Sequence, residues 1–227
     1  MKRSIKDLIE CNAETIQGDV LEIVDFYFDE ERLRIRYMLV QTGNWPFRRN
    51  AIIPVEAIER FDWDQNMFLV NLLQEQILTS PEIDGTKPIS RKQEQQLLNY
   101  YFGRDSWNAG NGTTFPGGNR MNGNKADITV RSIRELIGYY TAAIDGEVGV
   151  VDDYVVDDET WKLHSMVISV ERWIKGKKVI ISPRSITGFD REHGKVFVNL
   201  SEIAIKNSLP YETARVVMKA SHENQQV

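Results

Sequence analysis

The chain contains the stretch Ser-Ile-Lys-Asp-Leu-Ile at residues 4–9 and the related stretch Ser-Ile-Arg-Glu-Leu-Ile at residues 132–137. The same offset aligns the following residues without a gap from Ser4 to Asp84, and roughly a quarter of the aligned residues are identical. A match that keeps one register over this length indicates an internal duplication. We therefore expect two copies of one small domain, at residues 1–84 and residues 131–212.

Each copy has the pattern of a mainly β domain. Short runs rich in branched and aromatic residues recur at close spacing, with turn residues between them. These runs are residues 20–28, 35–40, 51–53 and 68–72 in the first copy and residues 148–156, 163–170, 179–181 and 196–200 in the second. A small barrel is favoured over an open sheet, because closure removes exposed strand edges.

Short helices are expected at the ends of each copy. Ser4 and Ser132 are placed to cap helices that begin one residue later. Residues 201–207 resemble a terminal helix that stops before a proline. Asp145-Gly146 predicts a tight hairpin, because this pair supplies the positive φ angles that such a turn needs.

The connector between the copies, residues 85–130, divides into two parts. Residues 90–102 predict a helix with a serine cap at its start and Gly103 as its stop. Residues 105–127 are dominated by glycine and asparagine, which predicts a flexible tether. The tail, residues 213–227, is expected to begin as a helix and to end in polar residues.

The net charge of −5 is unevenly distributed. Residues 1–84 carry 9 basic and 16 acidic side chains, whereas residues 131–212 carry 11 and 13. An acidic first copy repels phosphate, which argues against general nucleic-acid binding. The one basic cluster, Lys175-Gly176-Lys177-Lys178, is more typical of a solvated hairpin loop than of a phosphate site.

Cysteine usage and apolar patterning favour a cytoplasmic protein. The single cysteine, Cys11, permits no intrachain disulfide, which fits a reducing compartment. The N-terminal residues lack the apolar core of a signal peptide, and no apolar run of about 18 residues occurs. We expect no membrane insertion, and contact with a membrane only through a partner.

The sequence offers no catalytic or cofactor constellation. Its histidines are scattered, and neither a metal-binding spacing nor a phosphate-binding loop is present. The acids at residues 152–153 and 157–159 have the oxygen ligands of a cation site, but their spacing favours solvent-facing turns. Asp25 and Asp153 recur in both copies, which favours hydrogen-bond anchors over general bases. We expect no enzyme activity, no cofactor and no metal.

Two tryptophans, Trp45 and Trp173, occupy equivalent positions where a loop begins. A tryptophan at such a place either packs as a lid over a barrel end or forms an interface hot spot. The candidate interaction residues are these two tryptophans and the lysines of the basic cluster, Lys175, Lys177 and Lys178.

The second copy resembles a PRC-barrel domain. The matching stretches are Leu-Ile-Gly-Tyr-Tyr at 136–140, Asp-Gly-Glu-Val-Gly-Val-Val-Asp-Asp-Tyr at 145–154, Asp-Asp-Glu-Thr-Trp at 157–161, and residues 177–183 and 196–200. The first copy resembles the family less closely. The resemblance implies two small PRC-type β-barrels in tandem, flanked by short helices and joined by a helix and a Gly/Asn-rich linker. The family is similar to the cytoplasmic part of the photosynthetic reaction-centre H subunit and to the C-terminal domain of a ribosome-maturation factor, both of which bind proteins.

These observations favour a non-catalytic binding or adaptor module that contacts an unknown protein partner through its two barrels. A second hypothesis is self-association as a homo-oligomer, with apolar strands pairing face to face. Two alternatives stay open. One is a peripheral accessory of electron or proton transfer, similar to the reaction-centre H subunit. The other is a small-ligand carrier or enzyme with a site between the barrels, lined by Trp45, Trp173 and the Asp153 region.

Overall fold

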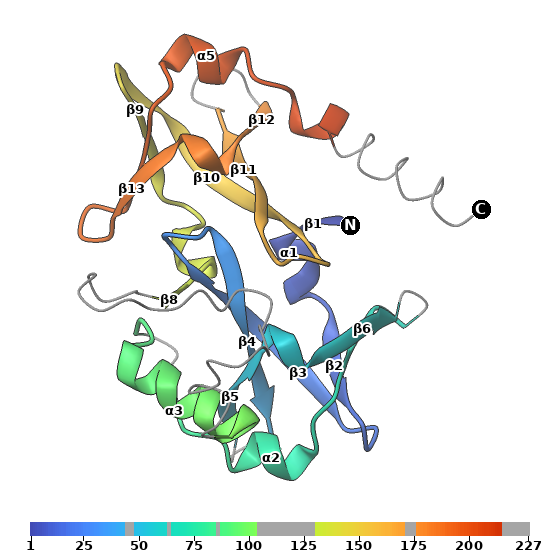
Figure 1. Ribbon diagram of the computed structural model, residues 1–227. Coiled ribbons are helices and arrows are strands. Elements are labelled where there is room, and N and C mark those ends of the chain that lie inside the picture. Colours follow the sequence, from blue (N-terminus) through green and yellow to red (C-terminus); the bar gives the residue numbers. More distant parts are fainter. Residues whose placement is uncertain (44–47, 63–64, 85–86, 104–129, 171–175, 215–227) are drawn as a thin grey trace, which may run out of the picture. The chain divides into compact units, whose positions relative to one another are not determined.

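The computed structural model describes residues 1–43, 48–62, 65–84, 87–103, 130–170 and 176–214 (Figure 1). The chain is mainly β, with two separate sheets. It divides into two compact units. The first-repeat unit comprises Ile9–Ser132, and the second-repeat unit comprises Met1–Leu8 together with Ile133–Val227. Each unit is named after the repeat that supplies most of its strands.

The first-repeat unit is one sheet in the order β5-β4-β3-β2-β7-β6, with β8 paired to β3. The β2–β7 pair is parallel and the other pairs are antiparallel. Its elements are β2 Asn12–Thr15, β3 Val20–Asp29, β4 Arg34–Thr42, β5 Arg49–Pro54, η1 Val55–Ala57, β6 Ile58–Asp62, β7 Met67–Val70, α2 Gln74–Leu78, α3 Arg91–Phe102 and β8 Val130–Ser132.

The second-repeat unit repeats this topology, in the order β12-β11-β10-β9-β14-β13, with β1 paired to β10. The β14–β9 pair is again the parallel one. Its elements are β1 Lys2–Ser4, α1 Ile5–Ile9, η2 Arg134–Leu136, β9 Tyr140–Ala143, β10 Gly146–Asp157, β11 Leu163–Ser169, β12 Lys178–Ile181, η3 Pro183–Ser185, β13 Ile186–Asp190, β14 Lys195–Val198 and α5 Glu202–Lys206. Helix α1 ends one residue beyond the segment that belongs to this unit.

The hydrophobic patterning of the sequence accounts for the long strands. All eight predicted runs are strands, and β3 and β10 form the centre of their sheets. Residues 26–28 of β3 are aromatic and fully buried, so this part of the strand is covered on both faces. Among the described residues, no pairing joins the outer strands β5 and β6, or β12 and β13. The observed architecture is therefore two mixed sheets.

The opening helix predicted for each copy forms only in the first. Helix α1 is capped by Ser4, whose Oγ accepts a hydrogen bond from the Asp7 amide at 3.1 Å. The corresponding segment of the second copy is a single 3-10 turn, η2. Gly138 follows that turn with φ +97°, whereas Glu10 holds the same place in the first copy. The glycine allows the chain to reverse early, and the helix predicted from residue 133 is therefore wrong.

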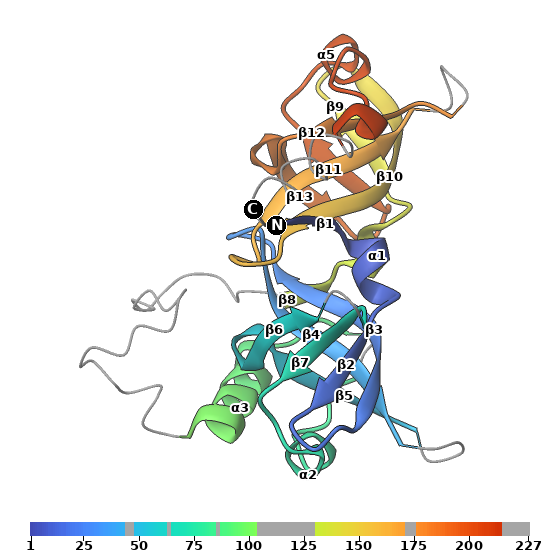
Figure 2. The same cartoon turned by 90° about the vertical axis from the view of Figure 1, so that its right-hand side faces the viewer.

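The two repeats exchange their first strands. Strand β1 starts the first repeat, yet it pairs with β10 of the second, with Arg3 opposite Val156. Strand β8 starts the second repeat and pairs with β3 of the first, with Arg131 opposite Phe28. Figure 2 shows β1 ahead of α1 beside the strands of the second-repeat unit. The compact units therefore cut the chain after Leu8 and after Ser132, not at the repeat boundaries.

The predicted connector helix is part of the first-repeat unit. Ser90 caps α3 through a reciprocal pair with Gln93, and Gly103 ends it with φ +80°. Leu97 and Tyr101 pack against a layer of side chains from β3, β4 and β5, namely Tyr27, Tyr37, Leu39 and Ile52. The predicted flexible tether, residues 105–127, lies outside the described residues, as does the tail beyond residue 214.

A buried polar cluster fixes α3 on this sheet. Glu94 is 2% exposed, and its Oε1 accepts a hydrogen bond from the Tyr37 hydroxyl at 3.1 Å. Arg36 Nη2 lies 3.2 Å from the same oxygen. Burial, together with the charge of Glu94, raises the pKa of Tyr37 well above its usual range, so the phenol stays a neutral donor. The helix is thus held by charge and by packing.

Cutting the tether tests the strand exchange. A protease site inserted between Gly117 and Gly118 divides the chain into halves that each carry one strand of the other half's sheet. After cleavage we expect both fragments to co-elute at the size of the intact chain, because neither can leave without unpairing a strand. Cleaved protein run in denaturant is the control. Separation of the fragments on a native column would contradict the exchange.

Replacing Glu94 by alanine tests the cluster under α3. The change removes the nearer of the two buried carboxylates beside Arg36, Asp29 being the other, and leaves the Tyr37 hydroxyl without its acceptor, so the free energy of unfolding should fall by about 2–4 kcal/mol. Gln96→Ala, at an exposed position of the same helix, is the matched control and should change it by less than about 0.5 kcal/mol. Denaturant unfolding measures both. Equal midpoints for the two variants would show that Glu94 contributes no such stability.

Candidate interaction surfaces

Each unit exposes a large apolar side chain at the tip of its first hairpin. Ile16, between β2 and β3, is 58% exposed, and Ile144, between β9 and β10, is 72% exposed. The two residues occupy equivalent positions in the repeat. A single exposed isoleucine is ordinary. The same exposure at the same place in two diverged copies marks the tips as candidate sites.

A terminal helix lies next to each tip and adds apolar side chains. Ile203 on α5 is 69% exposed, and Leu73 at the start of α2 is 37% exposed. Val20, at the start of β3, is 59% exposed beside the first tip. We call the two sets the tip–helix surfaces: Ile16, Val20 and Leu73 in the first-repeat unit, and Ile144 and Ile203 in the second.

Hydrogen bonds hold each tip against its helix in the same way. The amides of Ile16 and Ile144 donate to the carbonyls of Leu72 and Leu200, at 3.2 and 3.0 Å. In the second-repeat unit, the Glu202 amide at the start of α5 donates to Asp145 Oδ1 at 2.7 Å. In the first-repeat unit, the amide of Gln74 donates to Gln17 Oε1 at 3.3 Å. The exposed side chains are therefore presented by a fixed backbone.

The repeated acids, Asp25 and Asp153, anchor the exchanged strands. Ser132 Oγ donates to Asp25 Oδ2, and Ser4 Oγ donates to Asp153 Oδ2. The other carboxylate oxygen of each acid accepts the amide of the next residue, at 2.7 Å for Asp25 and 2.8 Å for Asp153. Burial raises the pKa of Asp153, against the lowering effect of its hydrogen bonds. The predicted role as hydrogen-bond anchors is confirmed.

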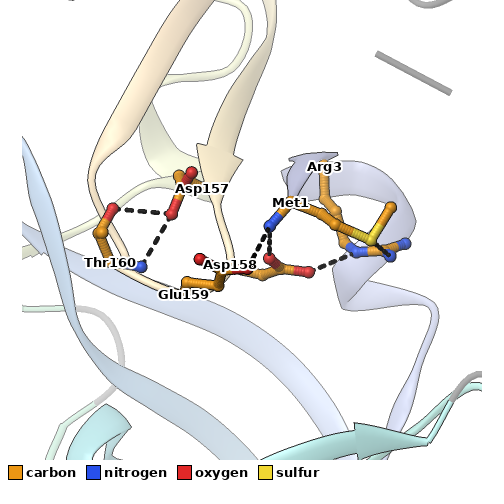
Figure 3. A network of polar contacts seen from close by, with 6 residues as sticks. All are labelled: Met1, Arg3, Asp157, Asp158, Glu159 and Thr160. Atoms are coloured by element: carbon orange, nitrogen blue, oxygen red, sulfur yellow. Dashed lines mark hydrogen bonds and ion pairs between the residues drawn. The ribbon is translucent and has the colours of Figure 1, made fainter. Parts of the chain in front are cut away.

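Two further acids of this region, Asp152 and Asp158, contact the same N-terminal segment, and Figure 3 shows the contacts of Asp158. Asp158 accepts from the Met1 ammonium and from Arg3 Nε, the latter at 2.8 Å. Asp152 lies between Lys6 and Lys178, at 3.2 and 2.9 Å. Burial opposes ionisation of Asp152, but hydrogen bonds from the two lysines lower its pKa overall.

Asp157 has a different role, because it closes the turn after β10. Its Oδ1 accepts from both the amide and the hydroxyl of Thr160 at 2.8 Å (Figure 3). Within the described part of the chain, no group of three or more His, Cys, Asp or Glu side chains is arranged to hold a metal ion.

The residues predicted to interact from sequence are only partly described. Trp45, Trp173 and Lys175 lie outside the described residues. Lys178 forms the ion pair with Asp152, and Lys177 Nζ donates to the carbonyl of Lys206 at 2.7 Å. Both described lysines thus have partners within their own unit. No helix in the described part of the chain has the length and apolar character needed to cross a membrane.

The tip–helix surfaces were missed from the sequence. The available signal was an isoleucine directly before each expected turn, Ile16 before Gln17-Gly18 and Ile144 before Asp145-Gly146. Such an isoleucine fits the buried end of a strand as well as an exposed tip. Side chains alternate between the two faces of a sheet only within the strand, so the pattern does not predict which way a side chain at the turn points. Only the fold shows that both side chains face solvent.

Paired substitutions test how the exchanged strands are held. Asp158→Asn removes the charge that binds Arg3 in β1, whereas Glu30→Gln removes the charge that binds Arg131 in β8. Each change should accelerate amide hydrogen exchange roughly three- to tenfold in its own strand and leave the other strand unchanged. The two variants serve as controls for each other. Acceleration in both strands from either single change would contradict this assignment.

No protein-family model and no curated protein gives a significant match to the chain. The PRC-barrel resemblance therefore rests on the sequence motifs quoted above. The functional argument rests on the geometry of the two units.

Proposed function

We propose that the chain is a non-catalytic protein-binding or adaptor module, built from two PRC-type barrels that each bind through a tip–helix surface. The observation that carries the proposal is the equivalent exposure of Ile16 and Ile144 on two diverged copies. Isoleucines that are mostly exposed to solvent contribute little to the core of their own unit. Their recurrence at one place is explained by a partner that covers them.

The energetics of such a surface suit protein recognition. Burying an isoleucine side chain stabilises a complex by about 1.5–3 kcal/mol. Two or three such side chains at the centre of an interface are enough for a binding hot spot, because a few residues carry most of the energy. The backbone hydrogen bonds at Ile16 and Ile144 keep each tip in place before binding. Binding therefore orders little additional chain, which lowers its entropic cost.

The two surfaces differ in ways that favour different contacts. The first adds Val20 and Leu73 to its isoleucine, whereas the second adds Ile203. The first repeat also carries a charge of −7, against −2 for the second. The shared isoleucines supply a contact common to both surfaces, so the partner of each barrel is selected by the residues that differ. We infer two unequal binding surfaces on one polypeptide.

Charge substitution at the tips tests the proposal. A carboxylate at an apolar contact must be desolvated on binding, so Ile16→Asp and Ile144→Asp should each weaken binding about tenfold or more. The measurement is quantitative affinity capture with crosslinking from the native host, comparing tagged wild type with each variant and with the double variant. Partners retained by wild type should be lost from the double variant.

Leu209→Asp is the matched control. This leucine is 49% exposed, lies outside both tip–helix surfaces and receives the same change. It should retain every wild-type partner, and thermal unfolding should show all variants folded. The proposal fails if the double variant retains the same partners at the same abundance as wild type and Leu209→Asp.

A further inference from the structure

Each unit pairs one of its long strands with a three-residue strand from the other repeat: β10 pairs with β1, and β3 pairs with β8. We call these edges of β10 and β3 the strand-accepting sites, and both bind an arginine and a serine of the incoming strand. On β10, the accepted segment places Arg3 next to Asp158 and Ser4 on Asp153. On β3, the accepted segment places Arg131 next to Glu30, at 2.5 Å, and Ser132 on Asp25. Both strands pair antiparallel over three residues in equivalent registers. The segment that fills either site has the same core: a strand ending in Arg-Ser.

The segment 1–8 also fixes itself to the second-repeat unit beyond its strand. The amide of Lys6 donates to Asp153 Oδ1 at 3.3 Å, and its ammonium group lies 3.2 Å from Asp152. Ile5 and Leu8 are fully buried. The polar contacts of Arg3, Ser4 and Lys6 described above are made to the body of the second repeat. None of them requires that the two parts belong to the same polypeptide.

The connection from this segment to the next strand is short. Helix α1 ends at Ile9 and β2 begins at Asn12, so only Glu10 and Cys11 lie between them. Cys11 is buried and its Sγ donates to Asn66 Oδ1 at 3.3 Å, which holds this connection to the first-repeat unit. Exchange of an identical element between two copies is a low-cost route to a dimer, and short connections such as this one are where it occurs when they are strained.

We propose that residues 1–8 are exchanged between two copies of this chain, so that the segment of each copy completes the second-repeat unit of the other. The partner is a second copy because the site binds the backbone register, serine and arginine that this chain's own segment provides. Within one chain the segment is present at a high effective concentration, which favours the monomer in dilute solution. Folding at high protein concentration favours the swapped dimer.

A charge exchange across the pair tests the proposal. One chain carries Arg3→Asp and a second chain carries Asp158→Arg. Within each chain alone, this pair becomes repulsive. In a swapped dimer of one chain of each kind, both pairs are attractive again. The substituted residue 3 of the first chain meets the substituted residue 158 of the second, and Arg3 of the second chain meets Asp158 of the first. The two chains are refolded separately and together, and are measured by light scattering and native mass spectrometry.

The mixture should form a one-to-one dimer at least about tenfold more abundant than the dimer of either chain alone, because two ion pairs are restored. A single chain carrying both substitutions restores the pair between residues 3 and 158 internally and loses the Met1 contact of Asp158 as the mixture does, so it should fold and remain mainly monomeric. If that control folds and the mixture yields only monomers, the proposal is wrong. A dimer equally abundant in the mixture and in each chain alone would also overturn it, since another surface would then hold the copies.

Discussion

The long strand β3 needs two partners along one edge, and this constraint organises the first-repeat unit. Strand β2 pairs only with residues 20–22, and β8 pairs with residues 27–29. Residues 27–29 are fully buried, so backbone groups left there without a partner would be costly. Strand β10 has the same need, which β9 and β1 meet. In both units the completing strand comes from the other repeat.

This exchange changes the meaning of the duplication. Two repeats on a tether would form independent domains, whose binding surfaces act separately. Here the first eight residues belong to the second-repeat unit, and residues 130–132 belong to the first. Each unit therefore depends on a segment that the other repeat encodes. Each tip–helix surface therefore belongs to a unit that is completed by a segment of the other repeat.

Much of the fold could be predicted from sequence because its signals are local. The strands follow the clustering of branched and aromatic residues, and α3 follows its serine cap and its terminal glycine. The exchange could not be predicted, because both repeats carry the same pair: Ser4 with Asp25 in one, and Ser132 with Asp153 in the other. Pairing within a repeat and pairing across repeats would both form the same serine–aspartate hydrogen bond. The exposed tip–helix surfaces were missed for a related reason, since exposure at a hairpin tip has no distinct sequence pattern.

Cross-strand nuclear Overhauser effects between backbone protons test the central claim most directly. The exchanged arrangement places Arg3 opposite Val156 and Arg131 opposite Phe28, so protons of these pairs should give strong signals. Pairing within each repeat would place Arg3 opposite Phe28 and Arg131 opposite Val156. Strong signals between Arg3 and Phe28, with none between Arg3 and Val156, would contradict the account of how the two units are completed.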